Sequence, residues 1–418
     1  MRIAITGYGA VTPFGVGVSA LWTGLTHAKS AVGSADETEF QRWSPAMASI
    51  KDFDPGKYLS RKQVVDTDRF TQLALVAAEE AINDAGFASG GPDSFGSIDP
   101  ERVGIALGSA FGGMESLELG MRQLTAGVSG RVSPRMVTKS MPNAAAGAMA
   151  MKWGVQGPVL TYATACASSA NAIGEAVYWL KSDQADVVLA GGAEYLFTPV
   201  VLAGLSAAGA IARTGPDDFS RWSRPFDRDR KGMVMGEGSA ILVLEPFEQA
   251  VGRGARIHAE LLGYGASNDA FHETAPHPEG RGAIQSMRRA LKSATLAPPD
   301  IGYINAHATA TPAGDAAECA ALRAVFGEHL VHIPVSSIKG GLGHMLGAAG
   351  AVESIASILA LETGWLPPTL HCDNPDEFAP PDIIPGSARR QWVDCVMSNS
   401  FGFGGQNASL IWKRYGRG

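Results

Sequence analysis

The same succession of predicted secondary-structure elements occurs twice in this chain, and this repetition constrains the fold more than any other feature. Residues 157–180 start with a Gly-Pro turn and a short β-prone run, pass through small residues around Cys166, and continue with apolar residues at helical spacing. Residues 333–361 repeat the same order of strand, small-residue junction and helix. Because order recurs as well as composition, we interpret the repeat as a duplication rather than a chance likeness between Gly- and Ala-rich segments.

Further elements recur in the same order. A strand-like run near the N-terminus leads into Gly-Tyr-Gly-Ala, and the run that starts at Ile257 leads into the same four residues. The amphipathic helix predicted over 68–85 has a counterpart over 282–294. We therefore predict two similar α/β halves, over 1–255 and 256–418.

Strands and helices are predicted to alternate between these landmarks. Strands are expected at 2–6, 103–107, 186–190, 239–244 and 301–306, and loop-rich segments at 31–61 and 213–235.

Composition and charge exclude several classes of protein. The chain has 418 residues, 45% of them apolar, and a formal net charge of -7 without long Lys/Arg runs, which argues against general nucleic-acid binding. Its four cysteines show neither paired nor metal-like spacing. No uninterrupted apolar stretch reaches the roughly 18 residues of a membrane span. We expect a cytoplasmic globular protein that binds neither nucleic acid nor membrane.

Cys166 lies at the junction between a predicted strand and a predicted helix. The commoner fate of such a cysteine is burial in a core, but unpaired N–H groups at a helix N-terminus favour a thiolate. If the two halves face each other, the equivalent junction brings Lys339 and His344 close, and the loop after the 301–306 strand brings His307. Of nine histidines, only these two lie in Gly-, Ala- and Thr-rich loops after strands. The sequence thus predicts a nucleophile with two hydrogen-bonding histidines.

Four segments resemble the type II β-ketoacyl-acyl-carrier-protein synthases of the thiolase-like superfamily, and the likeness extends over nearly the whole chain. They are Ala-Thr-Ala-Cys-Ala-Ser at 163–168, Asn-Ala-His-Ala-Thr-Ala-Thr-Pro-Ala-Gly-Asp at 305–315, the Lys- and His-containing stretch 336–350, and Asn-Ser-Phe-Gly-Phe-Gly-Gly at 399–405. The resemblance implies a five-layered αβαβα fold with two duplicated halves, and normally a dimer.

The resemblance also implies roles for individual residues. Cys166 would take an acyl group from the phosphopantetheine thioester of a carrier protein, and malonyl-carrier protein would then lose CO2 and attack that acyl group. His307 and His344 would stabilise the enolate, and backbone N–H groups of Cys166 and Phe403 would form an oxyanion hole. Phe403 would also be a mobile gate. Lys339 would order the site rather than act as a base.

Other expected roles concern support and substrate binding. Lys339 is expected to pair with Glu318, and Glu318 and Asp315 are expected to support the site's structure. Thr309 and Thr311 match positions that contact the pantetheine arm. No metal or organic cofactor is expected, since phosphopantetheine arrives on the acyl carrier protein.

Two positions depart from the family's usual pattern. Phe111 occupies an acyl-pocket position where many fatty-acid enzymes of this class carry a smaller aliphatic residue, so we expect short starters or a redirected product. In the segment 63–68, Val65 and Asp66 replace most of the basic patch that commonly meets the acidic carrier protein.

The segment Asp-Thr-Asp-Arg-Phe-Thr at 66–71, with Ser-Ser-Ile-Lys at 336–339, also resembles the ketosynthase and chain-length-factor subunits of type II polyketide synthases. Since Cys166 is present, the chain would then be the catalytic ketosynthase subunit. The expected partner is an identical subunit or a chain-length-factor-like subunit, and the pathway is fatty-acid or polyketide synthesis.

Two other classes of function compete with this interpretation. A non-decarboxylating thiolase-like acyltransferase would keep a second catalytic cysteine near the C-terminus, where this chain has the glycine-rich segment 399–405; a cysteine hydrolase belongs to the same alternative. Cys395 lies in a strand-like run and is expected in the core. A non-catalytic partner subunit is disfavoured, because Cys166 and both histidines are retained.

Overall fold

The chain forms two sets of strands with the same order, joined edge to edge, in a computed structural model that describes residues 1–418 except 36–37, 89–90, 92, 126–131 and 417–418. The first set runs outward from the join as β1 (Ile3–Thr12), β9 (Gly238–Pro246), β7 (Val187–Glu194), β5 (Val103–Gly108) and β6 (Val159–Tyr162). The second runs outward as β10 (Ala259–Asn268), β16 (Gln406–Arg414), β15 (Cys395–Gly402), β11 (Tyr303–Asn305) and β12 (Val335–Ser336). The join is the antiparallel pairing of β1 with β10.

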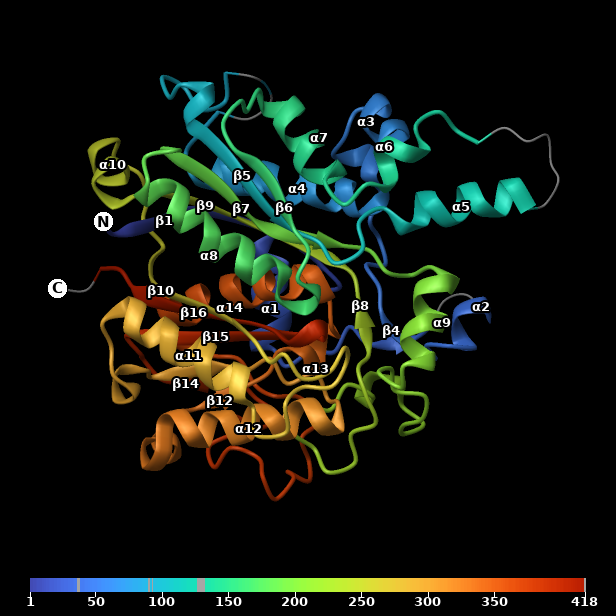
Figure 1. The fold of residues 1–418 in the computed structure, drawn as a ribbon, viewed down its shortest axis with the longest axis vertical. Helices are drawn as coiled ribbons and strands as arrows, with labels where there is room; N and C mark the ends of the chain where they lie inside the picture. Colours follow the sequence, from blue (N-terminus) through green and yellow to red (C-terminus); the bar gives the residue numbers. More distant parts are fainter. Residues whose placement is uncertain (36–37, 89–90, 92, 126–131, 417–418) are drawn as a thin grey trace.

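Helices cover both faces of both sets of strands. The outer face of the first set carries α4 (Arg69–Asp84) and α7 (Ala144–Trp153), and the outer face of the second carries α11 (Arg281–Ala294) and α12 (Pro312–Phe326). Between the two sets lie α8 (Ser168–Lys181) and α14 (Ala349–Thr363), whose side chains share one core with strands of both halves (Figure 1). The predicted αβαβα architecture is confirmed.

The remaining elements are short or lie at the rim. They are β2 (Gly15–Val16), α1 (Val18–Thr26), β3 (Gly33–Ser34), α2 (Thr38–Gln41), β4 (Ala46–Ala48), α3 (Arg61–Asp66), α5 (Met114–Thr125), α6 (Met136–Ser140), α9 (Pro199–Ala207), β8 (Met235–Gly236), α10 (Phe247–Gly252), α13 (Lys339–Leu342), β13 (Trp365–Leu366) and β14 (Arg389–Arg390). The segment 31–61, predicted to be irregular, thus holds several short elements.

The central strands are longer than predicted because glycines continue them. The strand expected at 2–6 runs through Gly7 and Gly9, where α4 lies against the backbone. A Cβ on these glycines would come within 2.3 Å of the Ala81 carbonyl oxygen and 2.1 Å of the Ala77 carbonyl oxygen, respectively. Glycine is therefore required for close packing here, not for a turn.

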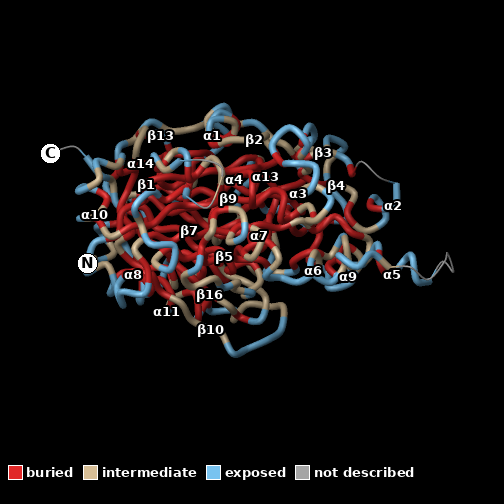
Figure 2. The backbone as a smooth tube through the Cα atoms, turned by 90° about the horizontal axis from the view of Figure 1, so that it is seen from above, coloured by how far each residue is buried: buried red, intermediate tan, exposed pale blue. Residues whose placement is uncertain are grey.

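Helix α14 is apolar enough to be mistaken for a membrane span. The stretch Leu346–Thr363 has the length and hydropathy of one, but 89% of it is buried inside the protein. Figure 2 shows the interior of the chain as continuous buried backbone, with α14 within it. We therefore assign α14 to the core, where both sets of strands supply its apolar neighbours.

A buried histidine joins the two halves far along the sheet from Cys166. His258, just before β10, contacts Asp84 of α4 through Nε2 at 2.8 Å and Glu362 of α14 through Nδ1 at 2.8 Å. Tyr8 of β1 donates its hydroxyl to the same Glu362 at 2.7 Å. The two carboxylates raise the pKa of His258, against the opposing effect of burial. This cluster ties the first half to the second by charge.

Candidate active site

Cys166 lies in a tight turn (Ala165–Ala167) that follows β6 and precedes α8. Ala165 has a φ of 50°, in the left-handed region, so the backbone is sharply bent beside the thiol. Gly402 packs against this bend: a Cβ there would come within 2.9 Å of the Cys166 nitrogen. The predicted helical stripe after the cysteine is confirmed, since the residues that form it are buried: Ala170, Ile173, Ala176, Val177 and Leu180.

Both predicted histidines reach Cys166 from the second half. His307 follows β11 and His344 follows α13, and their ring centroids lie 5.3 Å apart with the planes at 82°. The Cys166 sulfur and one nitrogen of each ring lie within 4.8 Å of one another. Backbone bonds hold His344 in place: its N–H donates to the Val234 carbonyl at 2.7 Å. The convergence predicted from the duplication is therefore present.

The two imidazoles are neutral. Burial holds the pKa of His307 and His344 well below 6.5, and the nearby Lys339 ammonium lowers both further. Nδ1 of His307 and both ring nitrogens of His344 have no hydrogen-bond partner among the described residues. Each neutral ring carries one N–H that it can donate without losing its proton, which suits the binding of a developing oxyanion.

The resting Cys166 is a thiol, contrary to the thiolate that its place before a helix suggested. Burial raises its pKa to about 12, outweighing the opposing effects of Lys339 and of the backbone N–H groups of Phe403 and Cys166 itself. The Cys166 thiol therefore has to lose its proton at the moment when the sulfur reacts with its substrate. The same two N–H groups are those expected to form an oxyanion hole.

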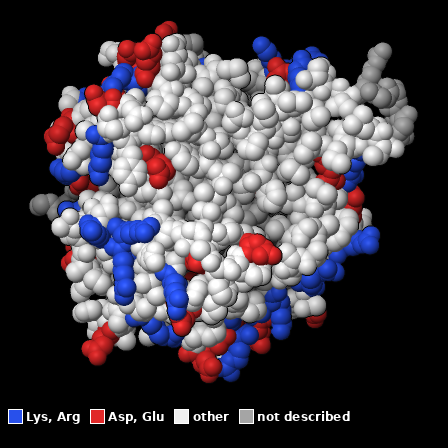
Figure 3. Space-filling view, viewed as in Figure 1, with Lys and Arg blue, Asp and Glu red and all other residues white. Residues whose placement is uncertain are grey.

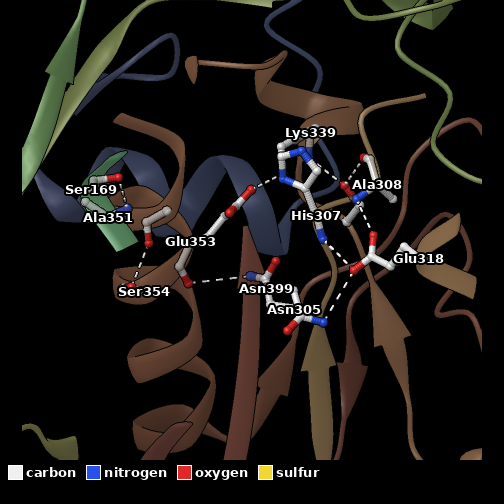
Figure 4. A network of polar contacts seen from close by, with 12 residues as sticks. Ser169, Asn305, His307, Ala308, Glu318, Lys339, Ala351, Glu353, Ser354 and Asn399 are labelled. Atoms are coloured by element: carbon white, nitrogen blue, oxygen red, sulfur yellow. Dashed lines mark hydrogen bonds and ion pairs between the residues drawn. The ribbon is translucent and has the colours of Figure 1, made fainter. Parts of the chain in front are cut away.

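Lys339 pairs with a different carboxylate from the one predicted. Its Nζ forms a buried ion pair with Glu353 of α14, and not with Glu318 (Figure 4). Glu318 instead accepts the backbone N–H groups of His307 at 2.9 Å and Ala308 at 2.7 Å. Glu318 therefore fixes the backbone of the His307 loop, while Lys339 acts on the site through its charge.

Asp315 supports the same loop from α12. Its carboxylate accepts the N–H groups of Ala310 at 3.1 Å and Phe226 at 2.8 Å, and burial raises its pKa to about 7. The hydroxyls of Thr309 and Thr311 lie 3.0 Å apart. These contacts order the loop that carries His307.

A narrow pocket of about 70 Å³ leads to Cys166 from the second half. Of the predicted site residues, its walls contain Cys166, His307, Thr309, Thr311, Glu318 and Phe403; His344, Lys339, Asp315 and Phe111 are not wall residues.

The gate residue Phe403 belongs to a loop that is fastened to another loop. The neighbouring Gly404 donates its N–H to the Glu273 carbonyl at 2.8 Å and accepts from Asn268 Nδ2 at 2.7 Å. Asp269 and Thr274 of that second loop also line the pocket. Sequence reasoning missed this loop, although it follows the strand that repeats β1.

Phe111 is 36% exposed and its N–H donates to Glu194 Oε1 at 3.2 Å.

In the segment 63–68, Asp66 forms an ion pair with Arg135 at 2.5 Å, and Val65 is exposed.

The donor atoms of Cys166, His307 and His344 lie close enough together to hold a metal ion. The Lys339 charge disfavours a cation at this point, because it already lowers the pKa of both imidazoles. Cys395 is the first residue of β15 and is buried in the core that this strand shares with the outer helices, so it offers no second nucleophile.

A duplicated five-layered fold with a cysteine from one half and two histidines from the other defines a thiolase-like acyl-transferring enzyme. Residues 1–250 match the family described as "Beta-ketoacyl synthase, N-terminal domain", and residues 258–373 match "Beta-ketoacyl synthase, C-terminal domain". The chain belongs to the β-ketoacyl synthase family.

Curated and solved relatives agree with this assignment. The "3-oxoacyl-[acyl-carrier-protein] synthase 2" of Synechocystis sp. is 40% identical over 417 residues, which cover 99% of this chain and 98% of the relative. The protein of that name from Coxiella burnetii is 39% identical over 414 residues, covering 99% and 98%. Among solved structures, the ishigamide ketosynthase/chain length factor matches with a TM-score of 0.89 at 33% identity, covering 99% of each chain. A β-ketoacyl synthase from Burkholderia phymatum matches with a TM-score of 0.88 at 34% identity, covering 99% of this chain and 100% of that one. The predicted thiolase-like fold is confirmed.

Proposed function

We propose that this chain is a β-ketoacyl-[acyl-carrier-protein] synthase that condenses malonyl-carrier protein with an acyl group held on Cys166, releasing CO2. The observation that carries the proposal is the convergence of Cys166 with two neutral histidines in one buried site. Family membership and the names of the curated relatives support the same activity.

Acyl transfer comes first. The Cys166 sulfur attacks the carbonyl carbon of an acyl thioester while one neighbouring imidazole relays the thiol proton to the leaving pantetheine sulfur. The bond from the carbonyl carbon to that sulfur then breaks, and no imidazolium accumulates beside the Lys339 ammonium. The N–H groups of Cys166 and Phe403 stabilise the oxyanion; removing one such donor commonly costs about 2.7–4 kcal/mol in the barrier.

Condensation follows in the same site. The bond between the malonyl carboxylate and its α-carbon breaks, CO2 leaves, and the electron pair forms an enolate. N–H groups of His307 and His344 donate to the enolate oxygen. The α-carbon then attacks the acyl-cysteine carbonyl, the carbon–sulfur bond breaks, and Cys166 leaves as a thiolate that takes up one proton from solvent. Lys339 keeps both rings neutral by raising the cost of a second positive charge.

This scheme needs no metal or organic cofactor, because decarboxylation supplies the driving force. Phosphopantetheine arrives on the carrier protein through the pocket, whose walls include Thr309 and Thr311, two residues with hydroxyls that can hydrogen-bond the arm. We propose a cytoplasmic location for the enzyme.

We also propose that the enzyme works as a dimer with an identical or a chain-length-factor-like subunit. Figure 3 shows few charged side chains at the centre of the face that bears β6 and α8. The edge strand β6 is unpaired on its outer side in the described chain, and Leu160 on it is 52% exposed.

One similar solved structure is titled as a type II polyketide synthase carrier protein in complex with its ketosynthase, at 30% identity.

Intact-mass spectrometry tests the proposal. Acyl-carrier protein should add one acyl group to the wild-type enzyme but none to Cys166→Ala, and Cys395→Ser should still be acylated. Addition of malonyl-carrier protein should then give an extended β-ketoacyl carrier with release of CO2. Hydrolysis of the thioester, or the lack of an adduct, would favour the hydrolase or the non-catalytic subunit, and extension from acetyl-carrier protein would favour a thiolase-like enzyme.

A further inference from the structure

Glu194 is a buried carboxylate near Cys166 that the reaction scheme does not use. It is the last residue of β7, at the carboxyl end of a strand in the first half, and it is 0% exposed. In the described part of the chain it forms no ion pair with Lys, Arg or His. Burying a carboxylate without a cation is costly, so its presence calls for a specific role.

Four donors surround this carboxylate, and they come from both halves of the chain. Oε2 accepts the N–H groups of Ala110 at 2.6 Å and Gly347 at 3.1 Å. Oε1 accepts the N–H of Phe111 at 3.2 Å and the hydroxyl of Ser109 at 3.2 Å. Glu194 thus ties the loop after β5 to the turn after His344.

Both tied segments contribute to the apolar wall beside the nucleophile. Leu346, which immediately precedes Gly347, is 2% exposed and packs in the same cluster as Cys166, and Ala110 packs against that cluster. Leu346 has a φ of 40°, a strained conformation for a branched residue that needs support from its surroundings. Gly347 fits tightly: a Cβ there would come within 2.4 Å of Glu194 Oε2.

We propose that Glu194 is a positioning residue that fastens the 109–111 loop to the 346–348 turn and so holds the wall against which the acyl chain on Cys166 lies. This inference rests on the proposed acyl transfer to Cys166. Burial raises the pKa of Glu194 itself to about 7, so above that pH the carboxylate is charged and raises the pKa of the nearby thiol. The proposed role therefore has two measurable consequences that a merely structural role would not have. The wall selects among acyl chains of different length, and the carboxylate shifts the pKa of the Cys166 thiol.

Two variants separate these consequences. Glu194→Gln keeps an oxygen for Ala110 and Gly347 but removes the charge, whereas Glu194→Leu removes all four acceptor contacts. The matched control is Glu80→Gln: Glu80 is another largely buried carboxylate, which accepts backbone N–H groups from Ala10 and Val18 at 2.9 Å each. Glu80 lies in a separate cavity with Tyr8 and Asp84, and neither Cys166 nor Glu194 lines that cavity.

The geometric readout is the rate at which Cys166 is acylated by carrier proteins bearing short, medium and long chains, followed by intact mass. Misplacing one wall of a site by about 1 Å can cost up to about 100-fold in rate. We expect the ratio between the best and the worst accepted chain to fall about tenfold or more in Glu194→Leu, with a smaller fall in Glu194→Gln. Glu80→Gln should keep the wild-type ratio.

The electrostatic readout is the pH profile of Cys166 alkylation by iodoacetamide, which needs no carrier protein. Loss of the negative charge should move the profile of Glu194→Gln to lower pH, while Glu80→Gln keeps the wild-type profile. A wild-type profile and chain-length ratio in both Glu194 variants would overturn the proposal, as would changes that Glu80→Gln shares. If the wild type is not acylated at all, the proposed function fails, and the alkylation profile still decides whether Glu194 acts on Cys166. If Glu194→Leu does not fold, Glu194→Gln alone decides by both readouts.

Discussion

Replacing Lys339 by Met should destabilise the protein and slow the reaction of Cys166, because both effects depend on the Lys339 ammonium. The side chains of Lys339 and Glu353 are 3% and 2% exposed, so their ion pair is fully buried. Removing one partner of such a pair commonly costs about 3–5 kcal/mol, because the other charge is left buried and alone. Burial already raises the pKa of Glu353 to about 7 with Lys339 present, and without it the carboxyl should take up a proton.

The loss of the ammonium also changes the three reacting groups. Lys339 lowers the pKa of Cys166, His307 and His344. In Lys339→Met, alkylation of the thiol should therefore need a higher pH. The histidines should become easier to protonate, so condensation should fall as pH is lowered, at pH values where the wild type is unaffected.

Thermal unfolding and the pH profile of iodoacetamide alkylation measure the two effects. The double variant Lys339→Met/Glu353→Leu replaces the pair by apolar groups and should regain much of the lost stability, because no charge is stranded. It should not regain the wild-type alkylation profile, since the ammonium is still absent. A single variant as stable as the wild type, or an unchanged alkylation profile, would refute the reasoning.

Three further predictions concern the pocket, the turn beside the nucleophile and the join between the halves. Phe111→Ala should change the acyl-length profile in a carrier-protein elongation assay. An unchanged profile would show that Phe111 does not line the acyl pocket. Gly402→Ala should slow acylation of Cys166 about tenfold or more, because the added Cβ forces the nucleophile's backbone to shift; a normal rate would show that the turn is adaptable. Below pH 6.5, the His258→Gln variant should unfold at a lower temperature than the wild type. Because the two carboxylates raise the folded-state pKa of His258, this loss should be fully present below the unfolded value and disappear as pH rises through the folded value; a pH-independent difference would contradict it.

The residue pattern was sufficient to predict two similar halves and the central group of Cys166, His307 and His344, whereas the five layers were implied by the family resemblance. The repeated order of strand, junction and helix predicts two facing halves, and facing halves bring Cys166 to His307 and His344 without any further information. The helix over 68–85 followed from its periodicity, and α4 occupies Arg69–Asp84.

Other properties depend on packing that spacing does not encode. Lys339 had buried carboxylates on two different helices within reach, and the placement of α13 against α14 selects Glu353 over Glu318. The protonation of Cys166 was predicted wrongly, because the effect of a helix N-terminus is small next to complete burial of the thiol. Glu194 was overlooked because its four donors belong to segments that are distant in the chain.

The high pKa of the Cys166 thiol has a consequence for the lifetime of the enzyme. Peroxide attacks thiolates, and the damage passes from sulfenic to irreversible sulfinic and sulfonic acids. A buried thiol with a pKa of about 12 is almost entirely protonated between turnovers and presents little thiolate to an oxidant. We therefore expect peroxide to oxidise Cys166 in the substrate-free enzyme more slowly than it oxidises an unperturbed thiol.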